Sequence, residues 1–213
     1  MTRRRSSDPS RARGPRLALV LAAAAAAASC AAPLAVPPAA VVAQARVVPS
    51  YSARLNVTLH GPELRARTRV LLAFRRPDGL RIEIPGPTGA RLIAVARGER
   101  LWAVFPAERA VYEGAARATD LESLLGVALA PSEVMDLLTG VASPRVRAYR
   151  ARWGAALPRQ IDATLPDGAR LKATVEDAEA PATALGASAF TEPPHEGYRT
   201  IDGDQARSLW SGR

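Results

Sequence analysis

Alternation of apolar and polar residues is the clearest pattern along the chain. Within residues 51–60 the apolar side chains occupy every second position: Tyr51, Ala53, Leu55, Val57 and Leu59. A period of two is typical of a strand with one buried face. The pattern returns at 65–74, 80–84, 91–97, 101–105 and 110–113, with turn residues such as Pro77-Asp78-Gly79 between the segments. Short strands at even spacing predict an antiparallel meander that forms a barrel or a strongly curved sheet.

Two short segments then change to a helical period. The first has the capping-box sequence Thr119-Asp120-Leu121-Glu122 and ends at Gly126. The second begins near Pro131 and ends before Gly140. Their apolar residues fall on one face of each predicted helix: Leu121, Leu124, Leu125, Val134, Leu137 and Leu138.

Strand alternation resumes after the helices, and the two ends of the chain are less regular. Strands are predicted at 146–153, 160–165 and 171–175, and Phe190 is assigned to a last strand. Short helices are predicted at Val41–Val48 and at Asp204–Trp210. The predicted fold class is therefore mainly β with some α, in one domain over 41–213.

The N-terminus has the order of charge and hydropathy that a secretory signal requires. Arginines precede an uncharged apolar run from Leu17 to Ala28, followed by small residues and then Cys30. The run is shorter than the roughly 20 apolar residues that span a bilayer, so we interpret 1–29 as a signal peptide. The segment Ala27-Ala28-Ser29-Cys30 resembles the lipobox of bacterial lipoproteins, which implies lipid attachment at Cys30. The alternative is ordinary cleavage beside an incidental cysteine. Residues 30–40 are expected to form the lipid-attached tether.

Charge and composition point away from catalysis and nucleic-acid binding. The chain carries a net charge of +9, but residues 1–29 contribute six Arg and one Asp, and the other arginines are spread among acidic residues. With two histidines and one cysteine, no zinc ligand set is evident, and no nucleotide or hydrolase motif appears. We expect no catalytic residues, metal, cofactor or nucleic acid. The arginines at 65, 67 and 69 fit contact with anionic headgroups or, as the sequence favours, a solvated face.

The apolar faces of the strands and helices predict a hydrophobic interior between the sheet and the helices. Small side chains at inward positions leave room inside a curved sheet, as expected at Ala53, Ala66, Ala94, Ala148, Ala163 and Ala173. The predicted hydrophobic cavity is lined by Leu55, Val57, Leu59, Val70, Leu72, Leu80, Ile82, Ile84, Leu92, Trp102, Ile161 and Leu171. The six apolar residues of the two helices are predicted to cover it as a lid. The alternative is that the helices fill this space as an ordinary core.

The order of elements resembles the bacterial lipoprotein-localisation family, which includes a periplasmic lipoprotein carrier and its outer-membrane receptor. The resemblance rests on the segment 75–84 (RRPDGLRIEI), the turn Gly86-Pro87-Thr88-Gly89, Leu124-Leu125-Gly126 and Leu137-Leu138-Thr139-Gly140. It implies an incomplete antiparallel β-barrel with a helical lid over a hydrophobic cavity that takes acyl chains. The receptor displays a protruding leucine in a loop where this chain has Pro87 and Thr88.

The resemblance implies a lipid-anchored protein on the periplasmic face of the outer membrane. Such a protein binds lipid or lipoprotein acyl chains in lipoprotein transport or insertion, and its partners include the membrane and a periplasmic lipoprotein carrier. Two alternatives stay open. One is a structural or assembly lipoprotein that binds a protein partner with the same fold, and the other is an enzyme whose residues meet only in the folded chain.

Overall fold

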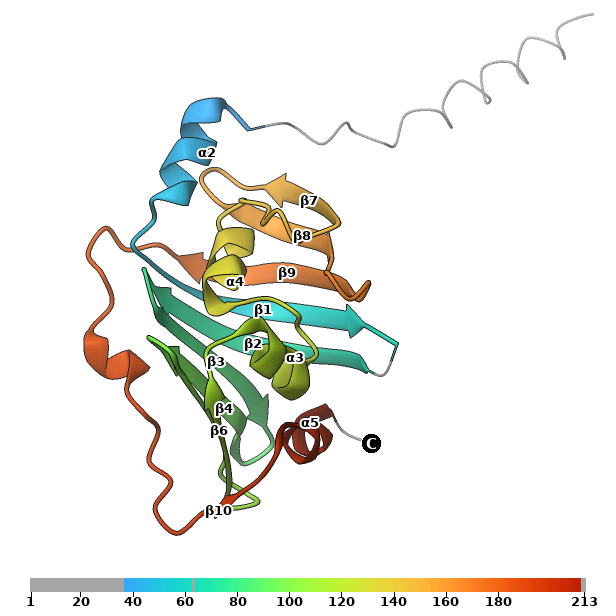
Figure 1. The fold of residues 1–213 in the computed structure, drawn as a ribbon. Coiled ribbons are helices and arrows are strands. Elements are labelled where there is room, and N and C mark those ends of the chain that lie inside the picture. The colour runs from blue at the N-terminus through green and yellow to red at the C-terminus, as the bar shows by residue number, and fades with distance from the viewer. Residues whose placement is uncertain (1–36, 63, 212–213) are drawn as a thin grey trace, which may run out of the picture. The chain divides into compact units, whose positions relative to one another are not determined.

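The computed structural model describes residues 37–62 and 64–211 (Figure 1). The predicted signal peptide, Cys30 and most of the tether lie outside the described residues, so the predictions made for them stay predictions. Within these ranges, ten strands form one sheet in the order β10-β6-β5-β4-β3-β2-β1-β9-β8-β7. The strands are β1 Ser50–His60, β2 Arg65–Arg75, β3 Gly79–Gly86, β4 Gly89–Arg97, β5 Arg100–Phe105, β6 Ala110–Ala115, β7 Ala148–Trp153, β8 Pro158–Thr164, β9 Arg170–Glu179 and β10 Arg199–Thr200.

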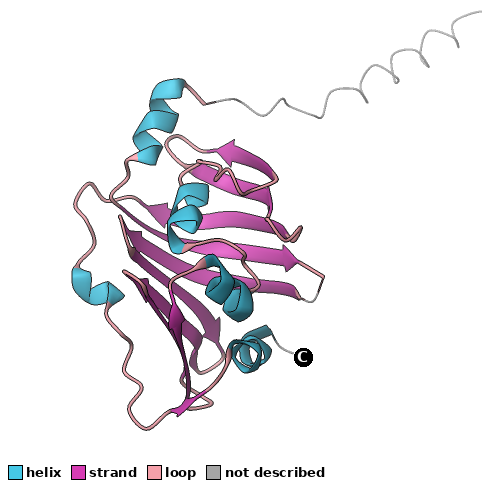
Figure 2. Ribbon diagram, viewed as in Figure 1, coloured by secondary structure: helices cyan, strands magenta, loops and turns pink. Residues whose placement is uncertain are grey.

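The sheet is antiparallel throughout, except that β10 pairs in parallel with β6. It is curved and open, and α3 (Ala118–Leu125), α4 (Pro131–Leu138) and α5 (Gly203–Ser211) lie on its inner side (Figure 2). The leading helix α2 covers Ala39–Arg46. This confirms the predicted class, mainly β with helices over an incomplete antiparallel barrel. None of the helices within 37–211 is long and apolar enough to cross a membrane.

Strand register confirms which face of each strand is buried. Leu55 pairs with Val70 on one side and Val175 on the other, and Leu72 pairs with Ile82. Because paired residues of neighbouring strands share a face, these side chains all point to the inner side of the sheet. The polar residues between them point to the outer side. The main hydrophobic core therefore lies between the inner face and the helices.

The two short helices begin and end for different local reasons. At the C-terminus of α3, Gly126 has φ 69°, and a Cβ there would lie 2.5 Å from the Leu64 side chain. Only glycine suits this left-handed position. At the start of α4, the Glu133 carboxylate accepts a hydrogen bond from the Ala130 N–H at 2.8 Å.

The predicted capping box at Thr119 is wrong. The helix begins at Ala118, so Thr119 already lies inside its first turn and makes no cap hydrogen bond to the backbone. The Asp120 carboxylate instead turns back to β6, where it accepts hydrogen bonds from the Ala115 N–H at 3.1 Å and the Tyr112 hydroxyl at 2.9 Å.

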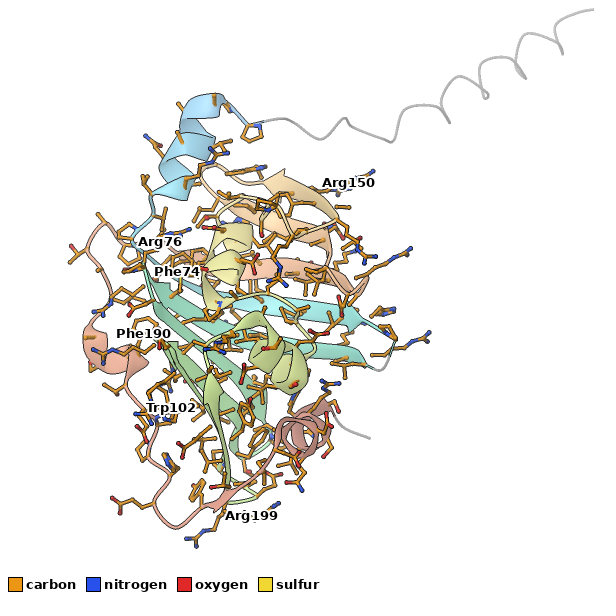
Figure 3. The ribbon with its side chains drawn as sticks, viewed as in Figure 1. Phe74, Arg76, Trp102, Arg150, Phe190 and Arg199 are labelled. Carbon is orange, nitrogen blue, oxygen red and sulfur yellow. The ribbon has the colours of Figure 1, made fainter. Side chains whose placement is uncertain are left out.

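Residues 180–198, which we call the C-terminal strap, cross the outer face of the sheet from β9 to β10. Phe190, predicted in a strand, lies instead in a short 3₁₀ helix, η1 (Ala187–Phe190), and is fully buried against Val95 and Trp102 (Figure 3). A Cβ at Gly79 would come within 3.0 Å of the Phe190 ring, so glycine allows this close approach. The strap is held at its start by Ser50, whose Oγ accepts a hydrogen bond from the Leu185 N–H at 2.7 Å.

Candidate apolar ligand site

An apolar cavity of about 110 Å³ lies between the inner face of the sheet and the helices. Strands β1, β2, β3, β8 and β9 form one wall, and α3, α4 and the segment between them form the other. Thr68 is the one lining residue with a polar atom outside the backbone, apart from the indole nitrogen of Trp210. The cavity therefore offers contacts to hydrocarbon and almost no hydrogen bonds.

Nine of the twelve predicted cavity residues line this space. They are Leu55, Val57, Leu59, Val70, Leu72, Ile82, Ile84, Ile161 and Leu171. Of the six small residues expected inside, Ala66 and Ala173 also line it, and Ala53, Ala94 and Ala163 are buried in the core. Ala148 is exposed, because its register with Thr164 places it on the outer face of the edge strand.

Three of the predicted cavity residues lie elsewhere. Trp102 points to the outer face, where it contacts Phe190 of the strap, so its assignment to the cavity is wrong. Leu80 and Leu92 face inward and are buried, but they do not reach the cavity. Leu80 pairs with Phe74, whose ring stacks on Tyr51 at 5.4 Å and fills that end of the core. Leu92 lies one strand beyond the cavity wall, opposite Ile84.

Five of the six predicted lid residues line the cavity from above. They are Leu121, Leu125, Val134, Leu137 and Leu138. Leu124 is fully buried but points away from the cavity, so it does not belong to the lid's inner face. Its carbonyl oxygen accepts a hydrogen bond from the Trp210 indole N–H at 2.7 Å.

The prediction missed Trp210, which reaches the cavity from the C-terminal helix. Ala206 and Trp210 are both buried and are spaced i, i+4, which is the signal that identifies the packed face of this helix. Arg207 donates hydrogen bonds to the carbonyl oxygens of Ser123 at 2.7 Å and Glu122 at 3.0 Å. The Glu122 carbonyl oxygen also accepts a hydrogen bond from the Gly126 N–H at 2.8 Å, whereas carbonyl groups nearer the end of a helix, such as that of Ser123, have no partner within it. Helix α5 therefore supplies donors to the end of α3. Helices α3 and α5 therefore cover the cavity together.

Helix α4 is held to the sheet near β7. The Tyr149 hydroxyl donates a hydrogen bond to the Leu137 carbonyl oxygen at 3.0 Å. Burial raises the pKa of Tyr149 above its ordinary value, so the hydroxyl keeps its proton, and this hydrogen bond, further into the alkaline range.

The site has little chemistry beyond apolar contact. No titratable side chain lines the cavity, and within the described ranges no group of three or more His, Cys, Asp or Glu residues could hold a metal ion. His195 lies in the strap, where its Nδ1 is 2.9 Å from the Pro193 carbonyl oxygen, and His60 is exposed on the outer face. A ligand in the cavity would be held by shape and burial.

The cavity is small for a ligand site. Pockets for small molecules usually enclose about 300–1,000 Å³. At about 110 Å³ the space admits part of one hydrocarbon chain. A larger apolar ligand would enter only if the helices moved away from the sheet.

Similarity to known proteins is found among solved structures. No protein-family model matches the chain, and no curated protein matches it. The chain is similar to an uncharacterized conserved protein from Thermus thermophilus, with 8% identity, a TM-score of 0.43, and coverage of 75% of this chain and 96% of that one. It is also similar to a LolA superfamily protein from Nitrosomonas europaea, with 10% identity, a TM-score of 0.43, and coverage of 74% and 99%.

Proposed function

We propose that this protein is an envelope lipoprotein that binds the acyl chains of lipids or lipoproteins between its curved sheet and its helices. The observation that carries the proposal is the cavity itself, whose lining is apolar except for Thr68 and the indole N–H of Trp210. In this proposal Cys30 carries the lipid anchor, and the protein acts in lipoprotein transport or insertion at the periplasmic face of the outer membrane. Its sequence resemblance to the lipoprotein-localisation family supports this location and the exchange of cargo with a periplasmic carrier.

The two walls of the cavity would have different roles. In this proposal the strand wall, which is continuous with a hydrogen-bonded sheet, changes shape little. The helical wall consists of two eight-residue helices and α5, which pack mainly through leucines. Each CH₂ group removed from water contributes about 0.8 kcal/mol. An acyl chain can therefore replace the leucine contacts that are lost when the helices move, at little net cost.

Native mass spectrometry on residues 37–213, expressed without the signal and most of the tether, tests the proposal. After incubation with a bacterial lipid extract, we expect a stoichiometric adduct of lipid mass that is displaced by a fluorescent apolar dye. Val57→Asp places a carboxylate in the cavity wall and should abolish both signals. Asn56→Ser changes the exposed neighbour and should leave both intact. Absence of lipid and dye binding in the parent protein would contradict the proposal.

The small volume of the cavity favours a second candidate, a structural or assembly lipoprotein whose helices form permanent core. In that case the protein would recover a stoichiometric protein partner from envelope extracts and would carry no lipid adduct.

A further inference from the structure

The outer face of the sheet carries a concentrated positive charge at one end, on the side opposite the cavity. Three consecutive rows of outward side chains cross β2, β1, β9, β8 and β7 there. We call this surface the basic face. Its cationic members are Arg65, Arg67, Arg69, Arg150, Arg152, Arg170 and Lys172. Arg150, at the edge strand, is labelled in Figure 3.

Strand register places these cations together although they are far apart in the sequence. The central row runs from Arg67 through Thr58, Lys172 and Asp162 to Arg150. Rows on one face lie two residues apart, about 7 Å, and strands about 4.8 Å apart. The basic face therefore covers roughly 19 Å by 14 Å.

Little negative charge neutralises this face. Asp162 is its one carboxylate, and its Oδ2 already accepts a hydrogen bond from Gln160 at 2.8 Å. Glu176, at the border, accepts a hydrogen bond from Asn56 at 2.6 Å and lies 3.6 Å from Arg69. Among the described residues, no ion pair is formed by the other six cations. Two shallow recesses of about 580 and 670 Å³ lie between the side chains and share Thr58, His60 and Lys172.

We propose that the basic face is a docking surface for the anionic headgroups of a membrane. The argument is charge complementarity combined with the absence of other anchors. The largest apolar side chain in the three rows is Ala148, whereas protein interfaces depend on buried aromatic or aliphatic side chains. The rows also contain no Phe, Tyr or Trp on which nucleic-acid bases could stack. Exposed cations without apolar anchors between them suit a layer of mobile phosphates.

This docking has a consequence for the cavity. With the basic face against the membrane, α3, α4 and α5 point away from it, toward whatever delivers or receives an acyl chain. The inference relies on the proposed envelope location, but it does not require that the cavity bind lipid.

Lys172 provides a natural probe, because it is the lone lysine of the chain and lies in the central row. The full chain would be reconstituted with vesicles of phosphatidylcholine alone or mixed with phosphatidylglycerol. A water-soluble amine-acetylating reagent would then be added, and mass spectrometry would follow the rate of Lys172 modification. We expect several-fold slower modification with the anionic vesicles. High salt should remove this protection, because it shortens the screening length to about 3 Å at 1 M.

Matched triple variants test whether the basic face causes the protection. Arg65→Gln/Arg67→Gln/Arg150→Gln should remove most of it, since each cation near an anionic surface strengthens association roughly fivefold. Arg97→Gln/Arg117→Gln/Arg199→Gln removes the same charge from exposed sites elsewhere and should keep it. The ratio of rates between the two vesicle types is compared within each variant, which cancels any direct effect on the reactivity of Lys172.

Three results would overturn the inference: equal rates with both vesicle types, equal loss of protection in both triple variants, or stronger protection by a single-stranded oligonucleotide or an acidic peptide than by the vesicles. Dye binding in the cavity is measured on the same samples. If dye binding fails in the parent chain while Lys172 is protected, the ligand proposal fails and the docking surface stands.

Discussion

The guanidinium of Arg76 donates a hydrogen bond to the carboxylate of Asp136 at 2.8 Å. Arg76 directly follows β2, whereas Asp136 lies in α4, so the pair ties the helical wall of the cavity to the sheet. Arg76 also donates to the Thr139 hydroxyl at 3.3 Å and lies over the Phe74 ring, 5.6 Å from its centre (Figure 3). The pair restrains movement of α4 away from the strands.

Arg76→Gln and Asp136→Asn should each accelerate entry of an apolar dye, because α4 then moves more freely. Both side chains are partly exposed, so each change should lower the free energy of unfolding by about 1 kcal/mol or less. The double variant should show no further acceleration, since one interaction is lost in all three proteins. Stopped-flow fluorescence measures the rate. Arg100→Gln breaks an exposed pair on the outer face and serves as the control; an equal effect there would contradict the restraint.

Leu137→Ala and Leu124→Ala separate the lid's inner face from the core. Both leucines are buried in the short helices, but only Leu137 lines the cavity. Leu124→Ala should lower stability by about 2–5 kcal/mol and leave dye affinity nearly unchanged. Leu137→Ala should cost less stability, because its side chain already borders empty space, and should weaken dye binding more. Thermal melts and dye titrations on both variants give the comparison. A larger stability loss at Leu137 with unchanged affinity would identify it as ordinary core.

Tyr51 and Tyr149 should respond in opposite ways to replacement by phenylalanine. The Tyr51 hydroxyl is buried without a hydrogen-bond partner among the described residues, whereas the Tyr149 hydroxyl donates to Leu137. An unpaired buried hydroxyl costs about 1–3 kcal/mol, so Tyr51→Phe should be neutral or stabilising. Tyr149→Phe should lower stability by about 1 kcal/mol, because it leaves the Leu137 carbonyl oxygen without its donor. Urea unfolding of the two variants decides this, and equal destabilisation would refute it.

Stability should fall as the pH rises from about 10 to about 12. Burial raises the pKa of Tyr51 to about 12, although the charge of Arg159 lowers it in part. Burial and the hydrogen bond to Asp120 raise the pKa of Tyr112 to about 12 as well. In this range the folded protein holds protons that the unfolded chain, with a tyrosine pKa of 10.0, has released. Stability is therefore complete below pH 10 and declines above it, by up to about 1.4 kcal/mol per pH unit for a group such as Tyr51.

The Tyr51→Phe variant checks this assignment, since it should show a shallower decline than the parent protein in urea unfolding at stepped alkaline pH. An unchanged slope would show that Tyr51 does not contribute.

Membrane attachment should depend on Cys30. A diacylated or triacylated cysteine supplies more than one chain, whereas a single chain binds only marginally. Cys30→Ser should therefore yield a protein that is soluble or retains its signal peptide. Fractionation and mass measurement of the mature chain test this, with Ser29→Ala as the control for the cleavage site. A serine variant that fractionates and matures like the parent would exclude the lipoprotein assignment.

Alternation along the chain is sufficient to predict the sheet because most strands have one solvent-exposed face. In β1, for example, Leu55 is 2% exposed while Asn56 is exposed, and the register follows from this contrast. The cavity wall could be predicted for the same reason. Alternation does not show how far along a strand the cavity extends. It therefore predicts Leu80 and Leu92 in the cavity, although other side chains fill that region.

For strand β5, the side of the sheet that each residue faces could not be predicted, because both faces of this strand are covered. From Leu101 to Phe105 every residue is buried, so no polar position reveals which side points inward. The sequence of the strap, rich in Ala and Pro and without a regular period, gave no sign that it would cover the outer face. The sequence therefore predicts the wrong side of the sheet for Trp102.

The strap has a mechanical consequence. It leaves the sheet after β9 and is fixed again at β6, where the Arg199 N–H donates to the Arg109 carbonyl oxygen at 2.9 Å and the Ile201 N–H donates to the Val111 carbonyl oxygen at 2.9 Å. This single segment therefore spans six neighbouring strand pairs, from β9 to β6. Because the strap lies on the outer, convex face, tighter curling of the sheet would lengthen its path and pull Phe190 away from Val95 and Trp102. The strap therefore resists tighter curling of the sheet between β9 and β6, which would narrow the space between the strands and the helices.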